Sequence, residues 1–324
     1  MALVVKSDRT GKSGSLRLLL PSVTAAAVLA VFGAFVAPGF LSLNNLSSIF
    51  MSTGLLALMS MAQNTVVIAG DNGIDLSVGA VASMTALLCP VVPMESFDGL
   101  LLGVLMAVAV GAFWGAVNGF GVRFLKIPAL IMTLIISSVV SGCTMVITKG
   151  QPATHISELL QKVSTVVVQP FRVLALIAVV FVVSGELVLL KTRFGRTLRL
   201  VGDNPSAAML SGLNTALAGF LAYVICGAMA GLVGLILVGY AGTTTMTMGN
   251  SYTLLSVASV AIGGTSLSGG KGSYVGGALG ALVMILLNSI LQAWNISQGM
   301  RSVVQGALLL VIVIMNIQSA KRRK

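Results

Sequence analysis

The chain has 324 residues, of which 56% are hydrophobic and only 8% are charged, and its mean hydropathy is +1.03. Soluble domains carry about 25% charged residues, so this composition excludes a soluble domain and indicates an integral membrane protein. The net charge of +11 would suggest a nucleic-acid partner in a soluble protein. Here most basic residues fall in short loops and tails, where they set topology, so no nucleic-acid partner is expected.

The predicted fold is an all-α membrane protein with about ten spans, because a spanning helix needs roughly 20 apolar residues. A basic tail over 1–17, with no cleavable signal, precedes a single transmembrane domain over 18–318, and a second basic tail over 319–324 follows. The eighth span is short, and broken or re-entrant segments are expected between the second and third. The predicted spans are approximately 18–37, 47–69, 76–94, 99–122, 127–148, 166–190, 216–238, 253–267, 274–293 and 301–318.

The distribution of Lys and Arg predicts the orientation of these spans. With the N-terminus inside, the inside segments hold 15 of the 19 basic residues, and the outside segments hold only Lys149, Lys162, Arg172 and Arg301. Because inside loops carry an excess of Lys and Arg, both termini are predicted to be cytoplasmic.

The stretch "GDNGIDLSVG" interrupts the chain after the second span. Asp75 is expected to cap the next helix by accepting backbone N–H groups. The alternative is that a broken helix here lines a transport path. Asn72 and Gly73 suit a left-handed turn.

Two asparagines lie within predicted spans, Asn64 and Asn118. They are expected to hydrogen-bond between helices, and the alternative is that they face a translocation cavity. Together with Asn72 and Asp75 they are the candidate residues of a translocation path.

Glu186 lies near the inside end of the sixth span and is followed by Lys191 and Arg193. Local pairing or snorkelling is the favoured interpretation of this carboxylate, and a proton relay is the alternative.

The sequence offers no pattern for catalysis, a metal or a cofactor. Cys89, Cys143 and Cys226 lie in apolar runs without metal-ligand spacing, and they are interpreted as packing residues. His155 is the only histidine, and no nucleophile or zinc-protease motif occurs. Glycines at four-residue spacing, at 111, 115 and 119, at 227 and 231 and at 276 and 280, predict close helix packing instead.

The longest inside connection reads "KTRFGRTLRLVGDNPSAAMLSGLN" over 191–214. Its first half is a basic, turn-rich loop. Asp203 or Asn204 followed by Pro205 predicts the start of a short helix, and Gly212 predicts its end. A short helix near 203–213, held outside the membrane, is a candidate docking surface, and an ordinary amphipathic loop is the alternative.

The stretch "IGGTSLSGGKGSYVGG" over 262–277 looks at first like a phosphate-binding loop. The motif requires a leading Gly and a Ser or Thr after the Lys, and Thr265 and Gly272 stand at those positions. The flanking runs are also apolar enough for lipid, so no phosphate site is predicted. The segment shares G-x-x-L-S-x-G with residues 73–79, which leaves an internal repeat or a chance echo open.

Over about 40–318 the chain resembles the permease subunit of bacterial sugar ATP-binding cassette importers of the ribose, xylose, arabinose and galactose type. Four stretches carry the resemblance: "GIDLSVG" at 73–79, "NGFGVRFLKIPALIMTL" at 118–134, "RFGRTLRLVGDNPSAAMLSGL" at 193–213 and "IGGTSLSGGKGS" at 262–273. The family implies a separate ATPase subunit, a periplasmic sugar-binding protein, a second permease copy or paralogue, and surrounding membrane lipid.

The resemblance also implies roles for particular residues. The turn at 262–273 becomes a tight interhelical connection made by Gly263, Gly264, Gly269, Gly270 and Lys271. The residues implied to contact the ATPase are Gly202, Asp203, Asn204, Ala207, Ala208, Ser211 and Gly212.

The chain departs from the family pattern at Asn72, where many members have Gly, and at Thr253 and Leu255, where many carry an acidic pair. The sequence therefore does not name a sugar. The rival functions are an ion-coupled secondary transporter of a small polar solute, with Asp71, Asp75 or Glu186 as coupling sites, and a membrane enzyme, for which no motif is present.

Overall fold

The computed structural model describes residues 13–71, 73–153, 156–168 and 171–321. The described residues form thirteen α-helices, one short 3-10 helix and a two-stranded antiparallel hairpin. In chain order these are α1 (Ser13–Val36), α2 (Leu43–Ile68), α3 (Val78–Leu88), η1 (Cys89–Val91), α4 (Phe97–Arg123), α5 (Ala129–Thr148), α6 (Glu158–Thr165), β1 (Val167–Val168), β2 (Phe171–Arg172), α7 (Val173–Lys191), α8 (Arg193–Asp203), α9 (Pro205–Leu210), α10 (Thr215–Ala241), α11 (Asn250–Ile262), α12 (Tyr274–Ala293) and α13 (Gln298–Lys321).

Seven of these helices are long and apolar enough to cross a membrane, namely α1, α2, α4, α5, α7, α10 and α12. α3 and α11 are also apolar but contain only 11 and 13 residues. The prediction of a helical, multi-span protein is confirmed, whereas the number of ten spans is not. Of the two predicted tails, over 1–17 and 319–324, residues 1–12 and 322–324 lie outside the described part of the chain, whereas 13–17 belong to α1 and 319–321 to α13.

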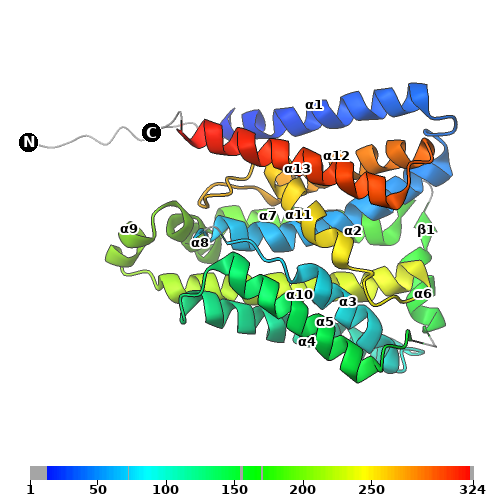
Figure 1. The fold of residues 1–324 in the computed structure, drawn as a ribbon, viewed down its shortest axis with the longest axis horizontal. Helices are drawn as coiled ribbons and strands as arrows, with labels where there is room; N and C mark the ends of the chain where they lie inside the picture. Colours follow the sequence, from blue (N-terminus) through cyan, green and yellow to red (C-terminus); the bar gives the residue numbers. More distant parts are fainter. Residues whose placement is uncertain (1–12, 72, 154–155, 169–170, 322–324) are drawn as a thin grey trace, which may run out of the picture.

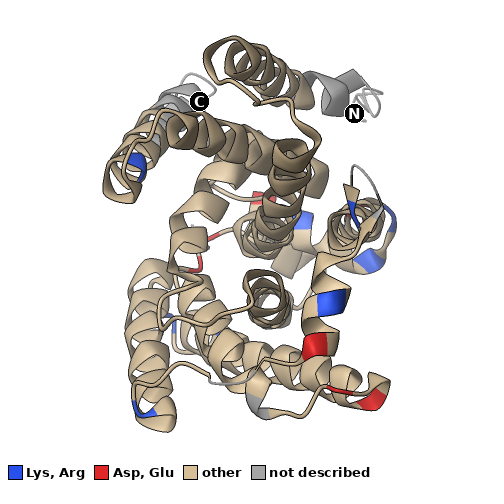
Figure 2. Ribbon diagram, turned by 90° about the vertical axis from the view of Figure 1, so that its right-hand side faces the viewer, with Lys and Arg blue, Asp and Glu red and all other residues tan. Residues whose placement is uncertain are grey.

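The long helices run side by side along the horizontal direction of Figure 1. Its left-hand end holds α8, α9 and the connection over 263–273, and we call it the junction end. Its right-hand end holds the connections over 37–42 and 294–297, and we call it the pocket end. Figure 2 looks along the bundle from the pocket end, so that many helices appear nearly end-on and charged residues are sparse.

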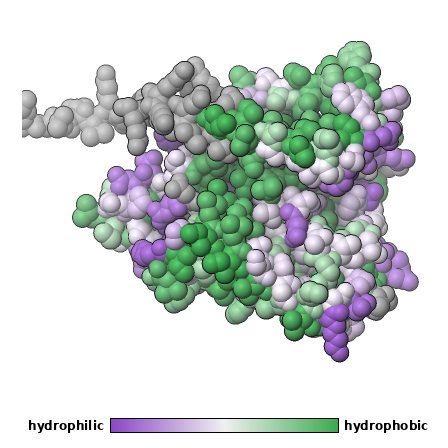
Figure 3. Space-filling model, viewed as in Figure 1, coloured by the Kyte–Doolittle hydropathy of each residue, from purple (hydrophilic) through white to green (hydrophobic). Residues whose placement is uncertain are grey.

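Large apolar side chains are exposed around the long helices, including Phe35, Phe113, Val146 and Val180. Figure 3 shows hydrophobic residues across the middle of one face and hydrophilic residues toward the two ends. This is the pattern of a surface that meets lipid along its middle and water at its ends.

Two predicted spans are half-helices. α3 and α11 begin inside the bundle, where a Cβ on Gly79 would lie 2.7 Å from the carbonyl oxygen of Gly249 and 3.0 Å from the Cα of Asn250. Ser83 Oγ accepts a hydrogen bond from Gly249 N at 2.9 Å. The N-terminal ends of the two half-helices therefore meet in the protein interior.

The glycine rows lie where α4 packs against α10. A Cβ on Gly111 would lie 2.1 Å from the carbonyl oxygen of Gly227, and one on Gly231 would lie 2.1 Å from that of Ala107. Only glycine lets the two backbones approach this closely, so the close-packing interpretation holds for this pair of helices.

Two segments differ from their prediction. The span predicted from 166 begins only at Val173, because the β-branched residues Val167 and Val168 pair with Phe171 and Arg172 in a hairpin. The basic half of the 191–214 connection is the helix α8 instead of a turn-rich loop. Its Leu198 and Val201 are buried while Arg193 and Arg196 are exposed, so burial of an apolar stripe holds it helical.

The charge distribution predicts that the junction end is cytoplasmic. In a chain whose three cysteines are replaced by Ala, Ser206→Cys on α9 and Glu158→Cys on α6 place exposed thiols at opposite ends. A membrane-impermeant maleimide added to intact cells is expected to label the second variant and to spare the first until the membrane is opened. Labelling of both in intact cells would contradict this orientation.

Candidate functional site

The short helix α9 follows α8 with a single residue between them. Asn204 is that residue, and its Oδ1 accepts the N–H of Ala207 at 2.9 Å, while Pro205 occupies the first helical position. Gly212 ends the helix at a φ of +79°, and Leu213 N returns a hydrogen bond to Ala208 O at 3.1 Å. Of the two predicted caps, Asn204 performs the role, and Asp203 is the last residue of α8.

The two alanines assigned to ATPase contact face opposite ways. Ala208 is 4% exposed and packs with Val201 of α8 and Ala218 of α10, so its side chain attaches α9 to the rest of the protein. Ala207 is exposed. Sequence reasoning missed Met209 and Leu210, which are 64% and 87% exposed at the tip of the helix. Two large apolar side chains at an exposed tip are typical of an interaction surface.

Three separate backbone segments meet at the base of α8, and we call this contact the glycine junction. It consists of residues 68–70 at the C-terminal end of α2, residues 202–203 at the end of α8, and residues 269–270 before α12. Gly270 N donates to Ile68 O at 3.0 Å. A Cβ on Gly202 would lie 1.9 Å from Ile68 O and 2.5 Å from Gly270 N.

The geometry of the junction depends on glycine in a second way. Gly70, Gly269 and Gly270 have φ values of +84°, +99° and +74°. Only glycine adopts these values without strain. Because Gly202 and Gly270 were assigned to different roles by sequence, their contact could not be foreseen from either motif alone.

The 263–273 turn uses its amide groups internally. Gly269 N donates to Ser266 O, and Lys271 N donates to Gly269 O. Together with the bond from Gly270, three consecutive N–H groups are occupied, so they do not form a cradle for phosphate. Lys271 is exposed, and the Nη2 of Arg199 on α8 donates to Gly272 O at 3.0 Å.

The start of this turn is also closely packed. A Cβ on Gly263 would lie 2.3 Å from Gly276 O, and Gly264 has a φ of +81°. The turn therefore needs glycine at both its ends, which is consistent with a structural connection.

Arg123 holds α4 to the chain that follows α2. It forms an ion pair with Asp71, and its Nη2 donates to Ala69 O at 3.2 Å. Arg123 is 5% exposed and Asp71 is 55% exposed. In the sequence, Arg123 is one of the inside basic residues that indicate orientation, and nothing in the local pattern links it to Asp71.

Glu186 on α7 caps α12. Its Oε2 accepts hydrogen bonds from the backbone N–H groups of Tyr274 and Val275. The expected pairing with Lys191 or Arg193 is therefore wrong, because a carboxylate gains more from unsatisfied N–H groups at a helix start than from exposed cations.

The candidate path residues that the structure describes are fully buried. Asn64 donates to Ser273 O at 2.8 Å and accepts from Thr265 Oγ1 at 3.0 Å. Asp75 accepts from both the N–H and the hydroxyl of Ser77, at 2.8 and 2.6 Å. The prediction that Asp75 caps α3 is wrong, because Ser77 is the N-cap residue without a side-chain cap hydrogen bond, and Asp75 holds Ser77 in a local turn just before the helix.

Asn118 completes this polar group by donating to Ser77 Oγ at 2.8 Å. Asn64, Asp75 and Asn118 are each at most 1% exposed, so none lines an open cavity in this conformation. Asn72 lies outside the described residues. A role for the four in translocation stays a prediction.

The chain matches a protein family described as "Branched-chain amino acid transport system / permease component" over residues 45–313. It is 33% identical to the ribose import permease protein RbsC of Escherichia coli (strain K12), over 91% of this chain and 92% of that one. It is 29% identical to the autoinducer 2 import system permease protein LsrC of Enterobacter sp. (strain 638), over 90% and 84% of the two chains. It is 27% identical to the fructose import permease protein FruG of Bifidobacterium longum (strain NCC 2705), over 92% and 91%. No solved structure matches.

A methyl group at the glycine junction is expected to destabilise the protein. Gly202→Ala places a Cβ against two backbone atoms that cannot rotate away, and such overpacking costs about 1–3 kcal/mol. Gly142→Ala on α5 is the matched control, because its Cβ meets nothing within 4 Å. Thermal unfolding of the purified proteins in detergent should show a lower midpoint for the first variant only. Equal midpoints would mean that the three segments do not touch as described.

Proposed function

The chain belongs to the permease-component family of branched-chain amino acid transport systems, and we propose that it is the transmembrane subunit of an ATP-binding cassette importer for a monosaccharide. The predicted resemblance to importer permeases is confirmed by this membership and by the ribose and fructose import permeases among its relatives. The family is one of transport permeases, so the chain is not an enzyme by itself. The prediction of a multi-pass protein of the inner membrane is confirmed by the same membership and by the seven apolar helices.

The observation that carries the proposal is the helix α9. It stands at the junction end of the bundle with Ala207, Met209 and Leu210 exposed (Figure 1). Neither phosphate-binding spacing nor a free amide cradle occurs in the 263–273 turn, so ATP hydrolysis is assigned to a separate subunit that docks on α9. Asn204 serves this docking by fixing where α9 begins, Ser211 and Gly212 by fixing where it ends, and Gly202 and Asp203 by holding the end of α8 at the glycine junction.

The glycine junction supports coupling between that docking surface and the membrane helices. α8 continues into α9 and touches the end of α2 and the start of the segment leading to α12. Backbone atoms in such contact cannot absorb a displacement by rotating side chains. Movement of α9 by the ATPase would therefore be passed on to α2 and α12.

The remaining partners follow from the importer class. A periplasmic sugar-binding protein would deliver the solute at the pocket end, and a second permease copy or paralogue would complete the path. The exposed apolar side chains of the long helices supply the lipid-facing surface.

An ion-coupled transporter has less support. Of its three candidate carboxylates, Asp71 is paired with Arg123, Glu186 caps α12, and Asp75 is bonded to Ser77. Each one thus has a structural partner. The test that separates the two classes is uptake by proteoliposomes containing the chain with its ATPase and binding protein. We expect transport to require internal ATP and to persist when ion gradients are collapsed.

The apolar tip of α9 is expected to be required for docking. Leu210→Glu places a charge where an apolar contact is made, and Ala207→Glu adds bulk on the same exposed helix, so both should abolish co-purification of the ATPase and solute uptake.

Loss of the Asn204 cap in Asn204→Ala costs about 1 kcal/mol and should reduce uptake only in part.

The matched control is Val163→Glu, on the exposed side of α6 at the pocket end. This variant should retain the ATPase on affinity purification. If Leu210→Glu and Ala207→Glu also retain it, with full uptake, α9 is not the coupling element.

A further inference from the structure

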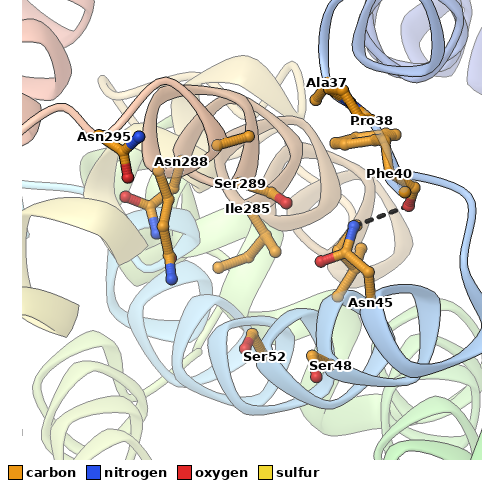
Figure 4. Close-up of a pocket in the computed structure, with 14 residues that line it drawn as sticks. Ala37, Pro38, Phe40, Asn45, Ser48, Ser52, Ile285, Asn288, Ser289 and Asn295 are labelled. Atoms are coloured by element: carbon orange, nitrogen blue, oxygen red, sulfur yellow. Dashed lines mark hydrogen bonds between the residues drawn. The ribbon is translucent and has the colours of Figure 1, made fainter.

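A polar cavity of about 500 Å³ opens at the pocket end, between the start of α2, the end of α12 and the 37–40 connection. Its size falls within the range of about 300–1,000 Å³ that is usual for small-molecule sites. Figure 4 shows Asn45, Ser48 and Ser52 on α2 lying across the cavity from Asn288 and Ser289 on α12.

The lining is rich in hydrogen-bonding groups, and none of its described residues carries a charged side chain. The hydroxyls of Ser52 and Ser289 make no hydrogen bond within the described part of the chain, and Asn288 uses only its Oδ1, which accepts from Gln305 at 3.3 Å. Ile49 and Ile285 add apolar surface. Unused donors and acceptors beside an apolar floor match a neutral solute with several hydroxyl groups and C–H faces.

Asn45 fixes the shape of the cavity instead of offering its donor to a ligand. Its Nδ2 donates to Phe40 O at 2.7 Å (Figure 4), which holds the 37–40 connection over the start of α2. Phe40 is itself 3% exposed, so this wall is anchored in the core.

A second cavity on the same two helices gives a contrast. It has about 400 Å³ and lies between α2, α7 and α12, where it is lined almost entirely by hydrocarbon side chains such as Val179, Ala278 and Leu282. The polar lining at the pocket end is therefore local, and it is not a general property of α2 and α12.

We propose that the polar cavity binds the transported solute as a neutral, polyhydroxylated molecule, with Ser52, Asn288 and Ser289 as its hydrogen-bonding contacts. This inference rests on the proposed function and adds to it a binding site and the side chains that contact the solute. A zwitterionic amino acid is disfavoured, because burying its charges without charged partners in the lining costs free energy.

The cavity is connected to the glycine junction through the helices α2 and α12. The C-terminal end of α2 and the segment before α12 form two sides of the glycine junction, and the opposite ends of the same helices form two walls of the cavity. A displacement of α8 that shifts α2 against α12 changes the width of the cavity.

The test uses the complete importer, with its ATPase and binding protein, in proteoliposomes supplied with radiolabelled ribose, fructose or leucine. Ser52→Leu and Ser289→Leu remove a hydroxyl and fill the cavity. We expect each to lower sugar uptake by about tenfold or more, since unpaired groups and lost volume both act against the solute. Ser52→Thr keeps the hydroxyl and should retain most uptake.

The matched control is Ser141→Leu, a substitution of the same kind at an exposed position of α5. It should transport sugar like the wild type. ATPase stimulation by the binding protein and assembly of the complex are measured for every variant, and both should be unchanged.

The outcomes separate the cavity from the importer function. If the wild type transports sugar and the two cavity variants do so equally well, the cavity is not the site although the importer assignment stands. If the variants lose assembly or ATPase stimulation together with uptake, the cavity is a docking surface for another protein, which overturns the proposal. If the wild type carries leucine and neither sugar, the proposed function fails as well.

Discussion

The contact on which the rest of the structure depends is the meeting of three backbones at the glycine junction. The end of α2, the end of α8 and the turn before α12 approach so closely that Gly202 has no room for a Cβ. Because these segments touch through main-chain atoms, van der Waals contact and the hydrogen bond from Gly270 to Ile68 fix their relative positions, and no side chain can change rotamer to loosen them. The helix α9 inherits its place from this contact, since only Asn204 separates it from α8.

Two predicted spans are half-helices, and the buried polar groups beside one of the breaks explain how it is tolerated. Non-helical backbone at membrane depth is tolerated only where protein surrounds it and satisfies its polar groups. The segment over 73–77 meets this condition through Asp75, Ser77 and Asn118, which are buried and hydrogen-bond to one another. The polar residues at 73–77 and Asn118 therefore have a structural role in stabilising the non-helical backbone, and this role does not depend on a solute.

The sequence predicted features that depend on near neighbours and missed those that join distant ones. Asn204, Pro205 and Gly212 bound α9 through capping rules that act over a few residues, so its limits were readable. The partners of Arg123 and Glu186 lie 52 and 88 residues away, at Asp71 and Tyr274, and no local pattern encodes such pairs. The helix α8 was predicted as a loop because arginines dominate the composition of residues 193–203, whereas burial of Leu198 and Val201 makes this segment helical.

The distribution of charge distinguishes the two ends of the molecule functionally. At the junction end, ionic groups such as Arg123 and Asp71 hold segments together, and the exposed tip of α9 is apolar, at Met209 and Leu210. At the pocket end, the described lining of the cavity between α2 and α12 offers amide and hydroxyl groups and no charged side chain. An uncharged lining binds a neutral solute through several weak, directional bonds, and a small change in the spacing of two helices breaks them together. In the proposed importer, a small movement releases the solute from such a site, and the backbone contacts at the other end of the same helices pass that movement on.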